Sequence, residues 1–204
     1  MNKSLTTIII LFSLFLGGCA GQPLPDHVKS DIQNTYDNIQ SYSAEIENRL
    51  DGDRFEVDQE WHLSVQKPDK YKRVVVKIND ADLNPPAIEI CAGSTYYSSE
   101  SGNKEVYKCE NLVKETFGVI EKLNLFESSL YDSAVTPDGG NYRVEITFKG
   151  QQAETDIWVD GESYLIERVR YRTPQASGST SIRTEVYKNI RLNQNFAQDE
   201  FNIP

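Results

Sequence analysis

Few side chains in this sequence have the types and spacing that catalysis requires. The two histidines are far apart: His27 lies near the N-terminus, and His62 lies beside Glu60 on the polar face of a predicted strand. The sequence contains no Gly-x-Ser-x-Gly, no His-x-x-x-His and no phosphate-binding loop, the patterns that indicate a nucleophile, a metal site or a nucleotide site. We therefore expect no enzymatic activity and no cofactor.

Acidic residues are abundant, but they form no recognisable site. Examples of paired carboxylates are Asp51 and Asp53, Asp80 and Asp82, and Asp156 and Asp160. Such pairs are more typical of solvated turns and strand faces than of acid–base catalysis. The segment Asn79-Asp80-Ala81-Asp82 offers oxygen ligands for calcium, but it lacks the glycine and the distal glutamate of an EF-hand loop. We expect no bound metal.

The first cysteine follows a hydrophobic N-terminal segment. Met1-Asn2-Lys3 precedes an apolar run over residues 5–16, which is followed by Gly17-Gly18-Cys19. The run has 12 residues, whereas a helix needs roughly 20 to span a bilayer. A short apolar run after a positive charge is typical of a cleavable signal peptide.

Leu16-Gly17-Gly18-Cys19 resembles the lipobox of bacterial lipoproteins. The resemblance implies that the Cys19 thiol carries a diacylglycerol and that cleavage frees an amine for a further acyl chain such as palmitate. Two or more chains hold a protein on a membrane, which one chain does only marginally. The alternative is an ordinary secretory signal with a chance cysteine. We predict a lipoprotein signal peptide over residues 1–18, a tether over 19–25 and a single domain over 26–204.

The overall charge limits the partners that the protein can have. Removal of Lys3 with the signal changes the formal charge from −10 to −11. An acidic protein has no electrostatic reason to bind nucleic acid or anionic lipid headgroups non-specifically. The expected membrane contact is the N-terminal lipid, which places the protein on the extracytoplasmic side of the cell membrane. In a cell with two membranes we expect the outer membrane, because Ala20 stands where a retention signal has aspartate.

The two remaining cysteines leave three interpretations open. Cys91 and Cys109 would form a disulfide readily outside the cytoplasm. Their spacing matches no common metal-ligand pattern, which weakens a redox or metal pair. Two free thiols are the third interpretation. Pairing across the predicted hairpins places the two cysteines at the same end but not opposite each other, so a bridge requires the chain to bend.

The periodicity of apolar residues predicts a mainly β protein with helices. Val28, Ile32, Tyr36 and Ile39 share one helical face, and residues 111–131 return to helical spacing. Residues 79–86 are predicted to form a polar loop. Alternation of apolar and polar residues, with intervening turn residues, predicts about eleven strands, over residues 42–50, 55–65, 71–78, 87–91, 94–99, 105–110, 133–136, 141–148, 154–159, 164–172 and 182–192.

This order of elements is similar to that of the LolA/LolB-type lipoprotein carriers, a superfamily that includes RseB-type sensors and LppX-type and GerS-like lipoproteins. The segments that carry the resemblance are Ile39-Gln40-Ser41-Tyr42-Ser43-Ala44, Lys67-Pro68-Asp69-Lys70-Tyr71-Lys72, Asp156-Ile157-Trp158-Val159-Asp160 and Phe201-Asn202-Ile203-Pro204. The resemblance implies an unclosed antiparallel barrel of about eleven strands around a helical plug, with an apolar cavity between them.

The resemblance implies a function that needs no catalytic residue. We expect a membrane-anchored protein that binds a lipid or a lipoprotein acyl chain for transfer or sequestration. The candidate cavity residues are Trp61, Leu63, Ile90, Tyr96, Phe117, Ile120, Phe126, Ile146, Phe148 and Trp158. The alternative is an interaction lipoprotein, GerS-like or RseB-like, that docks a protein partner or a second copy. The anchor and Lys67, which replaces an arginine of the carriers, both argue against a freely diffusing shuttle.

Overall fold

The computed structural model describes residues 27–53, 55–113, 131–150 and 153–204. Most of the described residues belong to strands. In chain order the elements are α1 (His27–Asp37), β1 (Ser41–Gly52), β2 (Phe55–Gln66), β3 (Lys70–Ile78), β4 (Ala81–Ala92), β5 (Thr95–Ser98), β6 (Lys104–Val106), β7 (Tyr131–Asp138), β8 (Asn141–Phe148), β9 (Glu154–Val159), β10 (Ile166–Pro174) and β11 (Thr180–Leu192).

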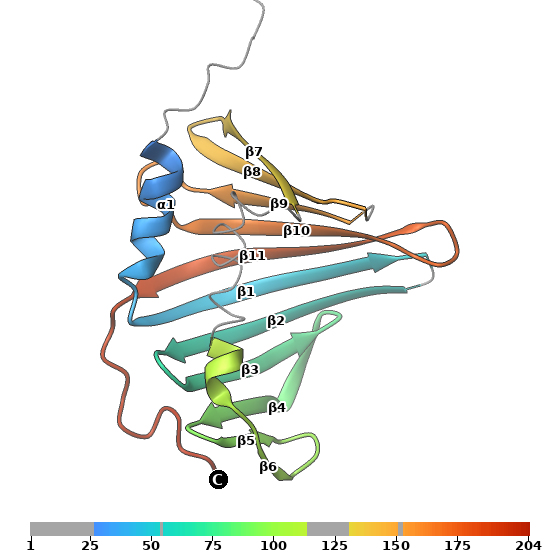
Figure 1. Cartoon of the computed structure of the whole chain (residues 1–204). Coiled ribbons are helices and arrows are strands. Elements are labelled where there is room, and N and C mark those ends of the chain that lie inside the picture. Colours follow the sequence, from blue (N-terminus) through green and yellow to red (C-terminus); the bar gives the residue numbers. More distant parts are fainter. Residues whose placement is uncertain (1–26, 54, 114–130, 151–152) are drawn as a thin grey trace, which may run out of the picture.

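The eleven strands form one antiparallel sheet (Figure 1). The strand order is β6-β5-β4-β3-β2-β1-β11-β10-β9-β8-β7, so the first and last strands of the chain lie side by side in its middle. The two edge strands, β6 and β7, are not paired with each other, and the sheet therefore stays open. This arrangement confirms the predicted unclosed antiparallel architecture of about eleven strands.

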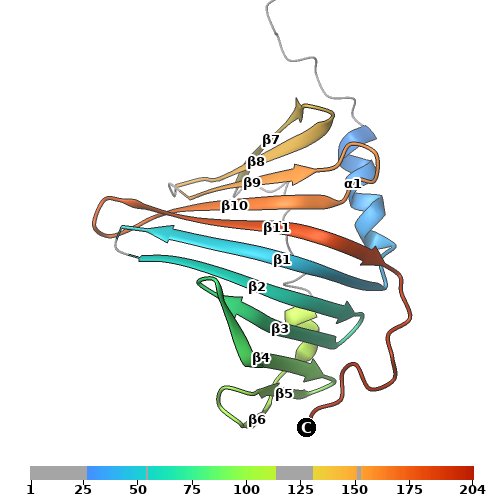
Figure 2. The ribbon, with the colours of Figure 1, turned by 180° about the vertical axis from the view of Figure 1, so that it is seen from behind.

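The long strands of the sheet are bent where its register shifts. Irregularities occur between Ser43 and Glu45, between Glu60 and Trp61, between Val75 and Lys77, and between Ile166 and Arg168. An extra residue in one strand of a pair bends that strand and increases its twist. The sheet is consequently curved, and both helical segments lie on the same face of it, in front in Figure 1 and behind in Figure 2.

Helix α1 packs on this face through the apolar stripe that the sequence predicts. Val28, Ile32, Tyr36 and Ile39 are all at least 96% buried. The Tyr36 hydroxyl also accepts a hydrogen bond from the backbone N–H of Ile166, at 2.7 Å. The predicted helical face is confirmed for Val28, Ile32 and Tyr36, whereas Ile39 is buried just beyond the end of the helix. Apolar contact and a buried hydrogen bond together fix α1 to the sheet.

The second predicted helix is only partly described. Residues 109–113 are helical, so this helix begins two residues before the predicted start. Residues 114–130 lie outside the described part of the chain, as do the predicted signal peptide, Cys19 and the whole predicted tether. Within the described part, the helices lack the length and hydrophobicity to cross a membrane.

The predicted loop over residues 79–86 is wrong, because β4 begins within it. Asn79 and Asp80 adopt positive φ angles of 47° and 62°, a conformation that lets two residues reverse the chain. Strand β4 then starts at once and includes two prolines, Pro85 and Pro86. Proline is tolerated there because β5 pairs only with the last four residues of β4, so this part of β4 lacks a second neighbour.

The C-terminal segment covers part of the opposite, convex face. Phe201 is 93% buried, and its ring contacts that of Phe196 edge-on, with centroids 5.1 Å apart. The ammonium of Lys70 lies 5.8 Å from the centre of the Phe201 ring, and Lys72 pairs with Glu200 at 3.4 Å. Both lysines belong to β3, so the end of the chain is held against the outside of that strand.

Candidate functional site

Strand alternation decides which side chains face the concave side of the sheet. Trp61 lies opposite Ile46, and Leu63 lies opposite Ala44, in the pairing of β1 with β2. All four side chains are at least 95% buried, whereas His62, which lies between Trp61 and Leu63, is exposed. The apolar side chains of these strands therefore face the helices, and the polar ones face solvent.

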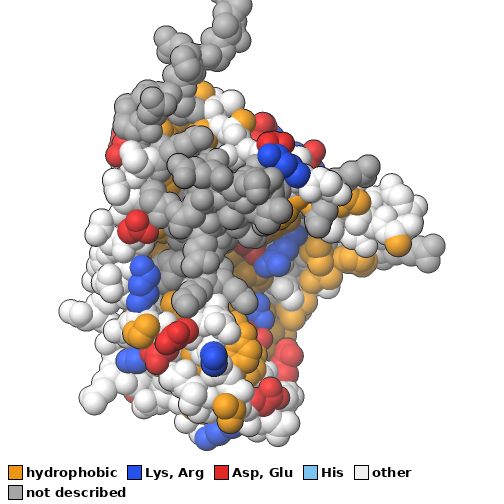
Figure 3. Space-filling view, viewed as in Figure 1, with side chains coloured by type: hydrophobic (Ala, Val, Ile, Leu, Met, Phe, Trp, Pro, Cys, Tyr) orange, Lys and Arg blue, Asp and Glu red, His pale blue; other side chains and the backbone are white. Residues whose placement is uncertain are grey.

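A cavity of about 620 Å³ lies on this concave face. In Figure 3 hydrophobic side chains mix with basic and acidic ones around a hollow on this side of the molecule. Seven of the protein's eleven tyrosines line the cavity, namely Tyr36, Tyr42, Tyr71, Tyr96, Tyr107, Tyr171 and Tyr187. The other lining residues are Ile46, Trp61, Leu63, Arg73, Glu89, Glu105, Leu112, Ile166, Arg183 and Glu185.

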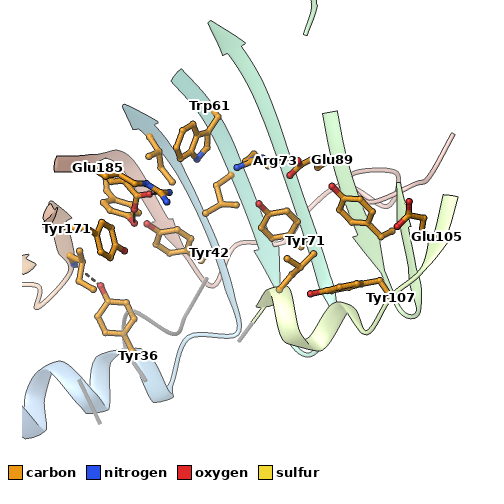
Figure 4. A pocket seen from close by; sticks show the side chains of 17 residues that line it. Tyr36, Tyr42, Trp61, Tyr71, Arg73, Glu89, Glu105, Tyr107, Tyr171 and Glu185 are labelled. Carbon is orange, nitrogen blue, oxygen red and sulfur yellow. Dashed lines mark hydrogen bonds and ion pairs between the residues drawn. The ribbon is translucent and has the colours of Figure 1, made fainter. Parts of the chain in front are cut away.

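A buried carboxylate, Glu185, lies in the cavity wall on the side of Tyr171 and Tyr42 (Figure 4). Glu185, only 5% exposed, accepts a hydrogen bond from the Tyr187 hydroxyl at 2.7 Å and forms an ion pair with Arg183. Arg183 also donates from Nε to the side-chain oxygen of Asn48, at 3.0 Å. Burial, reinforced by the Glu185 charge, raises the pKa of Tyr187 well above its ordinary value, so this phenol stays protonated and donates its proton to Glu185.

A second ion pair lies further along the wall. Arg73 contacts Glu89 through Nη2 at 2.8 Å, and its guanidinium lies 5.6 Å from the centre of the Trp61 ring. Its Nε is buried and has no hydrogen-bond partner among the described residues. Burial raises the pKa of the neighbouring Tyr71 to about 12, although the Arg73 charge opposes that shift. This part of the wall thus combines aromatic rings with paired charges.

The outer end of the cavity is held by a disulfide. Cys91 of β4 and Cys109 are bonded, with Cα atoms 5.5 Å apart, and both are fully buried. The bond fixes the segment after β6 against β4 and keeps Tyr107 beside Tyr96, with ring centroids 6.1 Å apart. Leu112, which lies on the short helix after Cys109, also lines the cavity.

The predicted cavity residues fall into four groups. Trp61, Leu63 and Tyr96 line the cavity. Ile146 and Phe148 belong to the core on the same face but do not line it. Phe117, Ile120 and Phe126 lie outside the described residues. Ile90 and Trp158 were predicted to face inward, but the structure places both on the convex face.

The position of Ile90 follows from its partners in the sheet. It lies opposite Lys72 of β3, whose ammonium pairs with Glu200 of the C-terminal segment on the convex face. Its neighbour Cys91 faces the core instead. Ile90 is 96% buried on the face that the C-terminal segment covers, so its hydrophobicity alone gives no indication of its direction.

Trp158 lies among arginines on the convex face. Its neighbours Ile157 and Val159 are completely buried in the core, so Trp158 must point the other way. Its indole Nε1–H donates to the Asp138 carboxylate at 2.9 Å, and the guanidinium of Arg168 stacks 3.7 Å from the ring centre. Since β9 is buried on both faces, it lacks the alternation that would have revealed this.

An ion cluster adjoins this tryptophan. The carboxylate of Asp156, whose side chain is 3% exposed, pairs with Arg143 at 2.8 Å and with Arg170 and Arg172 at 2.9 Å each. Burial alone would raise the pKa of Asp156. Hydrogen bonds from Arg143 and Arg170, together with the charge of Arg172, outweigh burial and lower the pKa below its ordinary value.

The sequence prediction missed the polar part of the cavity wall. The pattern of large apolar side chains gives no indication of Arg73, Glu89, Arg183 and Glu185, which are charged. A signal did exist for one of them: Arg73 lies two residues after Tyr71, and residues two apart on a strand share a face. The described residues contain no group of three or more histidines, cysteines, aspartates or glutamates that could hold a metal ion.

Comparisons with known proteins concern the fold. No protein-family model matches the sequence, and no curated protein matches it. Among solved structures, MucB is 10% identical with a TM-score of 0.50, over 90% of this chain and 65% of MucB. LprF from Mycobacterium bovis is 11% identical with a TM-score of 0.49, over 87% of this chain and 97% of LprF.

A LolA superfamily protein from Nitrosomonas europaea is 8% identical with a TM-score of 0.40, over 86% of this chain and 97% of that protein. Identities this low concern the architecture and not the activity. The fold of this chain, an unclosed antiparallel sheet of eleven strands among the described residues, is similar to that of MucB and agrees with the open architecture that the sequence resemblance implied.

Proposed function

We propose that this protein is a membrane-anchored lipoprotein that binds a hydrophobic ligand, a lipid or a lipoprotein acyl chain, for transfer or sequestration. The observation that carries the proposal is the cavity of about 620 Å³ between the concave sheet face and the helical segments. Ligand pockets typically have volumes of roughly 300–1,000 Å³. Each CH₂ group buried in such a space contributes about 0.8 kcal/mol, so binding by burial requires no catalytic group.

The anchor defines where this binding would take place. A lipid on Cys19 and a tether over residues 19–25 would hold the domain close to the extracytoplasmic face of a membrane. A tethered domain exchanges ligand only with partners within reach of the tether. Replacement of Cys19 by alanine should therefore move the protein from the membrane fraction to the soluble fraction and remove the lipid mass from its N-terminal peptide. Membrane retention of this variant would contradict the anchor.

The two tryptophans allow a test of the cavity itself. They are the only tryptophans in the chain. Trp61 lines the cavity, while Trp158 lies on the other face beneath Arg168. A Trp158→Phe protein therefore reports from the cavity, and a Trp61→Phe protein reports from outside it. We expect the neutral probe 12-bromododecanol, whose bromine quenches indole fluorescence on contact, to quench the first protein saturably and the second one weakly.

The probe should be added to full chains that carry Cys19→Ala and have been stripped of bound lipid. Equal quenching of both proteins would indicate binding to the surface instead of the cavity. No quenching of either protein would contradict the proposal and favour an interaction lipoprotein that docks a partner or a second copy, for which the open sheet edges offer unpaired backbone groups.

A further inference from the structure

The described residues of the cavity wall include more acidic than basic side chains. Arg73 pairs with Glu89, and Arg183 pairs with Glu185. The fifth charged lining residue is Glu105, and no described lysine, arginine or histidine lies within ion-pair distance of it. Among the described lining residues there is therefore one negative charge in excess, and this charge is located at the β6 end of the cavity.

Tyrosine rings surround this same end. Tyr71, Cys91, Tyr96 and Glu105 occupy one row across β3, β4, β5 and β6, where directly paired residues point to the same face. Tyr107 follows β6, and its ring lies 6.1 Å from that of Tyr96, at an angle of 54°. The face of an aromatic ring carries negative electrostatic potential and attracts cations within about 6 Å of its centre.

This group of side chains is held in place before any ligand arrives. The backbone N–H of Tyr107 donates to the carbonyl of Ser94, at 3.0 Å. Two residues later, Cys109 is bonded to Cys91. A preformed site loses less conformational entropy on binding than a loop that must first become ordered. In Figure 4 Tyr71, Glu89, Glu105 and Tyr107 lie together at one end of the cavity, apart from Tyr36 and Glu185.

We propose, on the premise of the proposed function, that the ligand is an amphiphile with a positively charged ammonium group at its polar end. The ammonium binds between the rings of Tyr96 and Tyr107 and the carboxylate of Glu105. The hydrocarbon part extends toward Trp61 and Leu63, in the apolar part of the wall. An anionic headgroup is disfavoured at this end, because Glu105 would repel it and the charges of both arginines of the wall are already paired with carboxylates, although the buried Nε of Arg73 keeps one hydrogen-bond donor without a described partner.

Three amphiphiles with the same twelve-carbon chain test this assignment: dodecyltrimethylammonium, dodecyl maltoside and dodecyl sulfate. Each is titrated below its critical micelle concentration into the full-length Cys19→Ala, Trp158→Phe protein, and its displacement of 12-bromododecanol is followed by recovery of Trp61 fluorescence. We expect the ammonium compound to bind roughly tenfold more tightly than the maltoside, the scale that a partly desolvated cation–π contact provides. We expect the sulfate to bind most weakly.

Two matched pairs of variants separate the local site from the acidic charge of the whole protein. Glu105→Gln should abolish most of the ammonium preference. Glu100→Gln should preserve it, since Glu100 is equally exposed but lies outside the cavity wall. Tyr107→Leu should weaken ammonium binding severalfold, whereas Tyr107→Phe should retain it, because the phenylalanine ring keeps the aromatic face and loses only the hydroxyl.

The outcomes distinguish this inference from the function on which it rests. If none of the three compounds displaces the probe and the probe itself does not bind, the proposed function fails. If all three compete equally, or if the sulfate or the maltoside binds best, the cationic ligand is wrong while the hydrophobic cavity stands. An equal loss of ammonium preference in Glu105→Gln and Glu100→Gln would assign the preference to overall charge and overturn the site.

Discussion

Trp61 and Trp158 have similar neighbours on opposite faces of the same sheet. Both are more than 90% buried, and both have an arginine guanidinium over the ring, Arg73 at 5.6 Å and Arg168 at 3.7 Å. The two regions differ in what surrounds the pair. Trp61 borders a cavity, whereas Trp158 donates a hydrogen bond to Asp138 and is closed over by arginine.

The difference indicates how one set of residue types performs two tasks. On the convex face, Asp156 is surrounded by Arg143, Arg170 and Arg172, so its charge is neutralised by direct ion pairs. On the concave face, the Nε of Arg73 lacks a described partner and the neighbouring side chains leave a hollow. Satisfied groups contribute to stability, while incompletely satisfied groups around a space are suited to ligand binding. The convex cluster should therefore control stability alone.

Among the substitutions that test this comparison, removal of the Trp158 ring should change the free energy of unfolding most. We expect Trp158→Ala to lower the free energy of unfolding by about 3–5 kcal/mol, as large-to-small changes of buried aromatic residues do. The affinity of the folded fraction for 12-bromododecanol, read from Trp61, should not change. Urea denaturation and probe titration measure the two quantities, and Phe55→Ala, at a 52% exposed position, is the control for an ordinary aromatic deletion. A loss of affinity in Trp158→Ala would remove the distinction between the two faces.

The disulfide lies on the concave side and should affect both properties. It closes a loop between residues 18 apart in sequence, for which loop-closure entropy predicts a contribution of about 3 kcal/mol. We expect Cys91→Ala/Cys109→Ala to lose this stability and to lose the ammonium preference, because Tyr107 would no longer be held beside Tyr96. Urea denaturation with and without dithiothreitol provides the control, since reduction should shift the midpoint of the native protein and leave that of the double variant unchanged. An unshifted native midpoint would contradict this expectation.

The architecture was predictable wherever one face of a helix or strand is buried and the other is exposed to solvent. In α1 the buried residues recur at helical spacing, and in the second half of β2 buried residues alternate with more exposed ones, so their inward residues follow from the sequence period. The count of about eleven strands was predictable for the same reason, because turn residues separate the alternating runs. The start of β4 was not predictable, because its two prolines are typical of a loop. A strand tolerates them there because β5 does not pair with this part of β4.

The cavity was predictable only in part. The alternation of β2 predicts that Trp61 and Leu63 face inward, and both line the cavity. Ile90 and Trp158, in contrast, belong to stretches that are buried on both faces. Consecutive residues are buried in such stretches whichever face they point to, so the direction of each side chain depends on partners elsewhere in the chain, such as Glu200 for the face of Ile90 and Arg168 for that of Trp158. The charged half of the wall depends on cross-strand pairing, Arg73 with Glu89 and Asn48 with Glu185, which no local pattern reveals.

Neutralising one carboxylate of the convex ion cluster should have the smallest effect on the free energy of unfolding, and it tests the contribution of charge alone. We expect Asp156→Asn to lower the free energy of unfolding at pH 7 by about 2 kcal/mol, less than for a fully buried pair because its arginine partners are partly exposed. The exposed carboxylate of Glu154, which pairs with Arg172, is the matched control, and Glu154→Gln should cost about 0.5 kcal/mol or less. Neither substitution should change probe affinity.

The pH dependence of this difference identifies its cause. Burial alone would raise the pKa of Asp156, but hydrogen bonds from Arg143 and Arg170 and the charge of Arg172 lower it below the ordinary value of 3.8. A folded-state pKa below the unfolded one means that the ionised carboxylate stabilises the fold fully above about pH 4. This contribution declines as the pH falls through the folded-state pKa, where both states are protonated. Urea denaturation of the native and Asp156→Asn proteins between pH 7 and pH 2.5 should therefore show two stabilities that converge in acid. A difference that stays constant over this range would mean that packing, and not charge, makes the convex face stable.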